Sequence, residues 1–266
     1  MAPNLIRLQV VGGGRMGEAL VAGLLHAGWA PGDLGVVERM EPRRKELADG
    51  FGGLAVMAAA APCEGAVIAV KPADVEEACK EIALAGCERV LSIAAGVTTA
   101  SLEAALGGGV PVVRAMPNTP AVVGEGASAI AAGSSASETD LDWAGSVLEA
   151  VGVVVRVKES QLDAVTGLSG SGPAYVFLVA ETLIEAGVLM GLAREAAEVL
   201  AVQTILGSAR LLQDSDEHAA ALRAAVTSPG GTTAAGLHQL ELGGVRAAFL
   251  SAVQAATERS RDLGRI

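Results

Sequence analysis

The stretch Ile6-Arg7-Leu8-Gln9-Val10-Val11-Gly12-Gly13-Gly14-Arg15-Met16-Gly17 decides the fold of this chain. Its first half reads as a buried β-strand, its second half fits the pattern G-x-G-x-x-G, and residues 18–27 follow as an expected helix. At such a junction the first glycine permits a tight turn, the second lets the backbone approach a pyrophosphate, and the third packs helix on strand. Phosphates would then lie against the free amides of the helix N-terminus. We therefore expect a dinucleotide site at Gly12, Gly13, Gly14, Arg15 and Met16.

The rest of the chain divides into two kinds of pattern. Up to about residue 158, short β-branched runs alternate with helical stretches, as in a parallel sheet flanked by helices. After residue 159, long apolar stretches at helical spacing take over. The sequence thus predicts an α/β, Rossmann-like doubly wound sheet in residues 1–158, followed by an all-α substrate and dimerisation domain in residues 159–266. The expected strands are 6–11, 34–38, 66–70, 90–93, 111–115 and 153–157.

Composition narrows the class of function. The net charge of −11 argues against nucleic acid, and Cys63, Cys79 and Cys87 show no metal-ligand spacing, so we expect no metal. The mean hydropathy of +0.46 raises the question of a membrane, but Glu181 and Glu185 interrupt the longest apolar stretch. The first residues lack the regions of a signal peptide. We therefore expect a cytoplasmic protein that binds no membrane, whose helical half forms a homo-oligomer because its apolar faces exceed what a monomer could bury.

The end of the second expected strand bears on the choice of cofactor. Glu38 lies where the dinucleotide fingerprint places an acid for the ribose 2′-hydroxyl, which favours NAD(H). Arg39, Arg43 and Arg44 follow at once, and guanidinium groups there could hold the 2′-phosphate of NADP(H). The residues alone leave both dinucleotides open.

Ligands of doubly wound sheets bind outside the carboxyl ends of the strands, so the segments after the later strands are further candidates. Lys71 could contact phosphate or ribose, and Met116 with Asn118 could border the nicotinamide. The expected cofactor contacts of these segments are Ala69, Val70, Lys71, Pro72, Ile93, Ala94, Ala95, Met116 and Asn118.

A second anion pocket is expected in the helical half, at Val226-Thr227-Ser228-Pro229-Gly230-Gly231-Thr232-Thr233. Ser228 reads as a helix N-cap and Pro229 as the first helical residue, which would leave the amides of Gly230, Gly231 and Thr232 for a carboxylate. The Thr233 hydroxyl could then hydrogen-bond a substrate nitrogen. Lysines occur only at 45, 71, 80 and 158, so the helical half offers no lysine as a proton donor. An imine, which can enter already protonated, suits that absence.

Taken together, these segments resemble the pyrroline-5-carboxylate reductase family. The segment 226–233 with the following Ala234-Ala235-Gly236-Leu237 is similar to the family signature, and residues 12–17, 69–72, 114–120 and 168–175 resemble its other motifs in the same order. The resemblance implies reduction of 1-pyrroline-5-carboxylate to L-proline by NAD(P)H, the last step of proline biosynthesis. It also implies a homodimer, often assembled into a decamer, with the substrate at the dimer interface.

Carried over by position, the resemblance makes Thr233 the residue nearest the imine and the expected catalytic group. It implies substrate contacts at Glu159, Ser228, Gly230, Gly231, Thr232 and Thr233. The chain departs from the family at Glu38 and Arg39, where small or hydroxyl residues suited to a 2′-phosphate are frequent, and at Ala225, where some members carry asparagine.

Our hypothesis from the sequence is hydride transfer from the nicotinamide to C5 of the pyrroline ring, with positioning as the main contribution and water resupplying the amine proton. Two alternatives remain open at this stage. One is a reductase of another small cyclic imine or keto acid, and the other is a non-enzymatic dinucleotide-binding protein.

Overall fold

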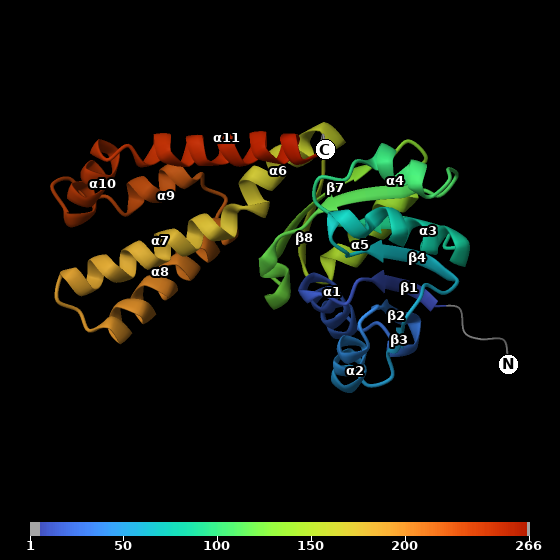
Figure 1. Cartoon of the computed structure of the whole chain (residues 1–266). Coiled ribbons are helices and arrows are strands. Elements are labelled where there is room, and N and C mark those ends of the chain that lie inside the picture. The colour runs from blue at the N-terminus through green and yellow to red at the C-terminus, as the bar shows by residue number, and fades with distance from the viewer. Residues whose placement is uncertain (1–5, 265–266) are drawn as a thin grey trace. The chain divides into compact units, whose positions relative to one another are not determined.

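The computed structural model describes residues 6–264 and divides into two compact units. Unit 1 comprises the described residues up to Ser171 together with those from Gln254 onward, and unit 2 is Gly172–Val253. The sheet of unit 1 and the helices of unit 2 are both drawn in Figure 1. The expected boundary at 158/159 thus differs from the limits of these units by a short helical segment and by the end of the last helix.

Unit 1 is built on one sheet of eight strands in the order β3-β2-β1-β4-β5-β6-β7-β8. All neighbouring strands are parallel except β6 and β7, which run antiparallel. The first six positions follow the order of a doubly wound dinucleotide-binding sheet, in which the order of successive strands reverses between β1 and β4. The strands are β1 (Ile6–Val11), β2 (Leu34–Val37), β3 (Ala55–Met57), β4 (Cys63–Ile68), β5 (Val90–Ser92), β6 (Val112–Met116), β7 (Gly126–Ala132) and β8 (Gly152–Arg156).

The sequence predicted six of these strands to within a few residues and did not predict the other two. β3 has only three residues, too few for a periodic pattern. β7 reads GASAIAA, in which Ile130 is the sole β-branched residue, so its composition does not favour a strand. Its place in the sheet comes from pairing with β6 and β8 on both sides.

Helices cover both faces of the sheet and form two separate cores. One core joins Val10 of β1 to Leu24 and Leu148 of two helices, and the other joins Val11 to Ile82 and Leu102 of two different helices. Successive residues of β1 therefore point into opposite cores, as the alternation of a strand requires. The helices of unit 1 before the domain junction are α1 (Arg15–His26), α2 (Glu41–Gly50), α3 (Val75–Ala85), α4 (Thr99–Ala105) and α5 (Glu138–Glu149).

All three cysteines are buried in the core that contains Val11 and Ile82, and burial raises the pKa of the Cys79 thiol to about 11.

Short helices and turns complete unit 1. The short helices are η1 (Pro31–Asp33), η2 (Pro72–Asp74), η3 (Thr119–Val123), η4 (Glu159–Gln161), α6 (Leu162–Val165) and the π-helical η5 (Thr166–Gly170).

The secondary structure of unit 2 consists of helices joined by turns, with no strand among its described residues. α7 (Gly172–Leu189) and α8 (Arg194–Asp214) lie side by side, as Figure 1 shows, and the absence of a side chain at Gly187 allows close approach to Ala197. Few side chains of these helices are buried: α7 has none and α8 has Ala197 and Ala201. The remaining helices are α9 (Ala219–Ala225), α10 (Thr232–Leu242) and α11 (Val245–Leu263), the last of which ends in unit 1.

By length and composition alone, one helical stretch among the described residues could cross a membrane. It is Glu159–Leu189, whose most apolar window has a mean hydropathy of 1.4 and is not buried within the chain. A helix that packs against a second copy of a protein meets the same criteria. The absence of a membrane partner therefore stays a prediction.

Candidate functional site

The glycine turn after β1 has the geometry expected of a dinucleotide site. Gly12 adopts a φ of +111°, which favours glycine, and its amide donates to the Val37 carbonyl at 2.8 Å. A Cβ at Gly17 would overlap the Gly12 carbonyl oxygen, so this glycine is needed for helix α1 to pack on the turn. A Cβ at Gly14 would meet no atom within 4 Å. The space beside Gly14, at the start of α1, is thus open to a ligand.

Glu38 closes the other side of this turn. Its Oε2 accepts a hydrogen bond from the Gly13 amide at 3.1 Å, and its Oε1 accepts from the Met40 amide at 2.9 Å. The three arginines that follow all have partners. Arg39 pairs with Glu77 and Glu81 of α3, Arg43 with Glu18, Glu46 and the Gly13 carbonyl, and Arg44 with the carbonyls of Glu38 and Arg39.

A pocket of about 330 Å³ lies outside the carboxyl ends of β1, β2 and β4. It occupies the point where strand order reverses, which is where doubly wound sheets bind nucleotides. Of the expected cofactor residues, it gathers Gly12, Gly14, Glu38, Arg39, Ala69, Val70 and Lys71. Asp74 and Glu81 also line it, although the sequence analysis did not single them out. These groups fit a dinucleotide, because backbone amides can donate to the pyrophosphate and a carboxylate can accept from a ribose hydroxyl.

Other expected cofactor residues lie outside the lining of this pocket. Arg15 is exposed on the first turn of α1, and Met16 packs against the core. Pro72 begins η2, and the Ala94 side chain is buried, so only its backbone could reach a ligand. Ile93 packs against the core, and Ala95 follows in the turn after β5.

Met116, the last residue of β6, and Asn118, shortly after it, contact the π-helical turn η5. The Asn118 side-chain amide donates to the Ser169 carbonyl at 3.1 Å and accepts from the Ala127 amide at 2.8 Å. The Met116 methyl group lies so close to Gly170 that a Cβ there would be 2.7 Å from it. These residues therefore fix the segment that leads into α7.

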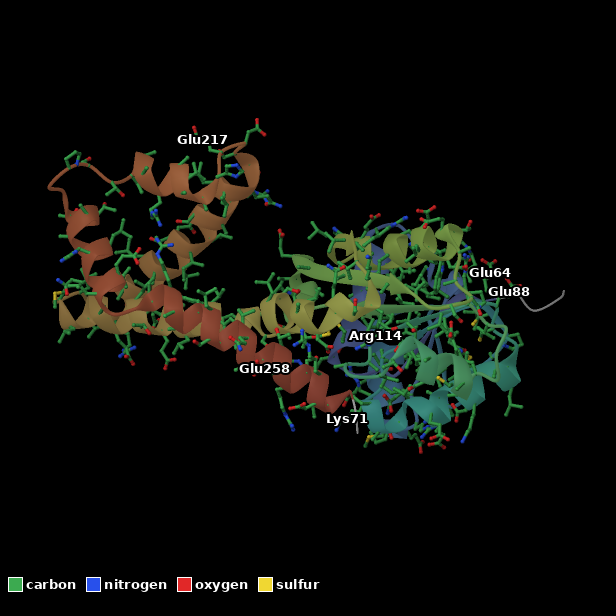
Figure 2. The ribbon with its side chains drawn as sticks, turned by 90° about the horizontal axis from the view of Figure 1, so that it is seen from above. Glu64, Lys71, Glu88, Arg114, Glu217 and Glu258 are labelled. Atoms are coloured by element: carbon green, nitrogen blue, oxygen red, sulfur yellow. The ribbon has the colours of Figure 1, made fainter. Side chains whose placement is uncertain are left out.

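Glu159 forms a cluster with Thr99 and Arg114, which the sequence analysis did not assign to the site. Its carboxylate accepts from the Thr99 amide and hydroxyl, both at 2.7 Å, and from Arg114 Nη1 at 3.0 Å. Partial burial opposes ionisation of Glu159, but the hydrogen bonds from Thr99 and Arg114 outweigh it and lower its pKa. Arg114 belongs to β6 and its side chain is buried within unit 1, whereas Lys71 lies at the surface of that unit (Figure 2). The sequence did carry one signal for this cluster, because an arginine within an apolar strand needs a partner when it is buried.

The expected helix start at Ser228 and Pro229 is wrong. Pro229 and Gly230 form a β-turn in which Gly230 has a φ of +72° and the Gly231 amide donates to the Ser228 carbonyl at 3.0 Å. Helix α10 begins at Thr232, with Gly231 as its N-cap and no side-chain cap. The amides without an intrahelical acceptor are therefore those at the start of α10, including Thr232 and Thr233, and the Gly231 amide is not among them. Ser228, Gly230, Thr232 and Thr233 are exposed.

Two regions of the chain match models of known protein families. Residues 159–263 match the model "Pyrroline-5-carboxylate reductase dimerisation", and residues 7–96 match "NADP oxidoreductase coenzyme F420-dependent". The chain is 47% identical to the pyrroline-5-carboxylate reductase of Mycobacterium tuberculosis, over 98% of this chain and 97% of that protein. The chain belongs to the pyrroline-5-carboxylate reductase family.

Solved structures of pyrroline-5-carboxylate reductases agree over the whole chain. The protein from Coxiella burnetii gives a TM-score of 0.92 at 37% identity and covers 98% of this chain and 99% of its own. The Plasmodium falciparum protein, solved with NADP bound, gives 0.85 at 33% identity with the same coverage. Enzymes of this family use NAD(P)H to catalyse the last step of proline biosynthesis. The match at 159–263 also identifies a homo-oligomerisation domain in the chain.

Proposed function

We propose that this chain reduces the C=N bond of 1-pyrroline-5-carboxylate to give L-proline, with its dinucleotide in the pocket beside Gly14 and its substrate at the turn 228–233. The observation that carries the proposal is the uncapped, exposed start of α10 after the Pro229–Gly230 turn. In a chain that also has the glycine turn of a dinucleotide site, a second backbone anion pocket calls for an anionic second reactant.

The glycine turn supports binding of NAD(P)H through backbone groups. The open space at Gly14 and the first amides of α1 suit a pyrophosphate, and the Glu38 carboxylate at the end of β2 suits a ribose. Lys71 would add a positive charge at the rim of the pocket. When bound, the reduced nicotinamide supplies the hydride that C5 of the pyrroline ring accepts.

The turn 228–233 supports binding of the substrate carboxylate. Amides at a helix start point along the axis and favour an anion, and here no side chain competes for them. Thr233 lies on the first turn of α10, where its hydroxyl could reach a ring nitrogen beside the bound carboxylate. The Thr232 amide would bind the anion, and Ser228, Gly230 and Gly231 would shape the turn around it.

Glu159 is proposed to act near the substrate by positioning rather than by proton transfer. Its carboxylate already accepts hydrogen bonds from Thr99 and Arg114, which hold the start of the helical region against α4 and β6. Met116 and Asn118 would act similarly at the nicotinamide end of the site. We also propose residue 158/159 as the functional domain boundary, because the dimerisation match begins there.

Assembly and location complete the proposal. The exposed apolar side chains of α7 and α8 need a partner, and a homodimer of unit 2, assembled further into a decamer, would cover them. The acidic chain, with a net charge of −11, is proposed to act in the cytoplasm without nucleic acid or membrane partners.

Steady-state rates with 1-pyrroline-5-carboxylate and each nicotinamide cofactor test the reaction. We expect consumption of the reduced cofactor to match the proline formed. Comparison with 1-piperideine carboxylate tests the ring size, and faster turnover of that substrate would replace the proposed one. Inactivity with both cofactors would overturn the proposal and leave a non-enzymatic dinucleotide-binding protein.

Replacement of Thr233 tests the substrate site. Thr233→Ala should lower kcat/KM by about tenfold or more, because a hydrogen bond that strengthens in the transition state is lost. Thr233→Ser keeps the hydroxyl and should retain most of the activity. If kcat/KM of Thr233→Ala equals that of the wild type, Thr233 has no part in the mechanism.

A further inference from the structure

The carboxylate of Glu38 is held in one place by the backbone. One oxygen accepts from the Gly13 amide at 3.1 Å and the other from the Met40 amide at 2.9 Å. Gly13 belongs to the glycine turn, and Glu38 lines the pocket beside it. The carboxylate is therefore fixed at the edge of the nucleotide pocket, where the fingerprint of a doubly wound sheet places the 2′-position of the adenosine ribose.

The neighbouring guanidinium group does not offset this negative charge. Arg39 donates to Glu77 at 2.6 Å and to Glu81 at 3.2 Å, both on α3. To hold a 2′-phosphate in a bidentate manner, Arg39 would have to leave two carboxylates that already use its donors.

The other arginines of this segment are engaged as well. Arg43 donates to Glu18, Glu46 and the Gly13 carbonyl, and Arg44 donates to two backbone carbonyls. Carboxylates outnumber cations in the pocket lining and in the ion pairs of Arg39. The carboxylates are those of Glu38, Asp74, Glu77 and Glu81, and the cations are Arg39 and Lys71.

We propose that Glu38 is a specificity-determining residue that makes this chain prefer NADH to NADPH. The inference rests on the proposed function and specifies its cofactor. A carboxylate accepts a hydrogen bond from a 2′-hydroxyl, whereas a 2′-phosphate carries up to about two negative charges at neutral pH and is repelled. The paired glutamates on α3 strengthen the discrimination by keeping Arg39 neutralised.

The test is direct binding of each reduced dinucleotide, followed by nicotinamide fluorescence, in the wild type and in variants. We expect the wild type to bind NADH at least about tenfold more tightly than NADPH. Glu38→Gln removes the charge with little change in size, although it leaves one acceptor oxygen for the two backbone amides, and it should bind NADPH more tightly than the wild type does. The double variant Glu77→Gln, Glu81→Gln releases Arg39 and should also strengthen NADPH binding.

Glu64→Gln is the matched control. It removes one negative charge at the amino end of β4, whereas Lys71 and the pocket follow the carboxyl end of that strand (Figure 2). The ratio of the two dissociation constants should not change in this variant. An equal shift in Glu64→Gln and Glu38→Gln would overturn the proposal, because net charge alone would explain it.

The outcomes separate this inference from the proposed function. Equal or tighter binding of NADPH by the wild type overturns the role of Glu38 while turnover of the imine continues. Failure of both dinucleotides to bind removes the cofactor pocket itself and so overturns both proposals. The wild-type comparison needs no variant to fold.

Discussion

At the scale of single residues, Glu159 shows how a charged side chain can be part of a site and of the fold together. It connects η4 to the start of α4 and to Arg114, whose side chain is only 10% exposed. Removing one partner from such a pair leaves the other charge poorly solvated. Its effect on stability should therefore exceed that of an ordinary surface ion pair.

Glu159→Gln should lower the free energy of unfolding by about 1–3 kcal/mol near neutral pH. Because folding lowers the pKa of Glu159, its contribution is complete above the unfolded value of about 4.3 and disappears as pH falls through the folded value. The difference between wild type and variant should then shrink in acid. Urea unfolding at a fixed protein concentration, repeated across pH, measures it.

Glu138→Gln is the control for this prediction. Glu138 pairs with Arg156 on the surface and its side chain is 82% exposed, so its loss should cost less than about 1 kcal/mol. Equal effects of Glu138→Gln and Glu159→Gln, or a difference that stays constant with pH, would contradict the account of the Glu159 cluster.

The sequence identified single residues well where local chemistry decides their role and less well where tertiary contacts do. Gly12 and Gly17 have the turn and packing geometry that their pattern requires, and the space beside Gly14 is open. Ser228 does not, because the Pro-Gly pair that follows it closes a turn before the helix can begin. Thr99 lies about sixty positions before its partner Glu159, and no local pattern connects them.

At the scale of elements, the strand-turn-helix unit β1–α1 assigns separate tasks to its glycines. Gly17 is needed for packing, since a Cβ there would meet the Gly12 carbonyl oxygen and lie 3.2 Å from a Val10 methyl group. Gly14 has an extended backbone that any residue can adopt and open space at its Cβ position. We therefore propose that the approach of a ligand explains this glycine.

Gly17→Ala and Gly14→Ala should accordingly affect different properties, the first the stability of the fold and the second the binding of the cofactor. Gly17→Ala should lower stability by about 1–3 kcal/mol through overpacking. Gly14→Ala should leave the cofactor-free protein nearly as stable as the wild type while weakening NADH binding by about tenfold or more. Thermal unfolding without cofactor and titration with NADH measure the two quantities. Normal NADH affinity in Gly14→Ala would show that no pyrophosphate approaches there.

Elements with a strong hydrophobic period could be predicted from the sequence, and weakly patterned ones could not. The edge of the sheet beyond β6 depends on β7, which pairs with β6 and β8 although its small residues do not favour a strand. The π-helical turn 166–170 is also set by tertiary contacts, namely those of Gly170 with Met116 and of Ser169 with Asn118.

At the scale of the whole molecule, the exposed apolar faces of unit 2 need a second copy of the chain to cover them. Large side chains of α7 and α8 stay exposed in the isolated chain, including Phe177 at 67% and Leu200 at 57%. Such exposure is unusual for a stable monomer and agrees with the dimerisation match over 159–263.

Charges placed on these helices should break the assembly. The double variant Phe177→Glu, Leu200→Glu should have a lower mass in light scattering at micromolar concentration than the wild type. Leu84→Glu is the control, because Leu84 is 91% exposed on α3 of unit 1 and lies outside the proposed interface. A wild type that is already monomeric, or a control that dissociates equally, would contradict the proposed interface.

The central claim is that one assembly binds a dinucleotide beside Gly14 and an imine carboxylate at the start of α10, so that hydride passes directly between them. The most direct measurement uses NADH carrying deuterium at both C4 positions together with unlabelled 1-pyrroline-5-carboxylate, with the product analysed by mass spectrometry and NMR. The account predicts one deuterium in each proline, bonded to C5. Proline without deuterium, or oxidation of the cofactor without proline, would contradict it.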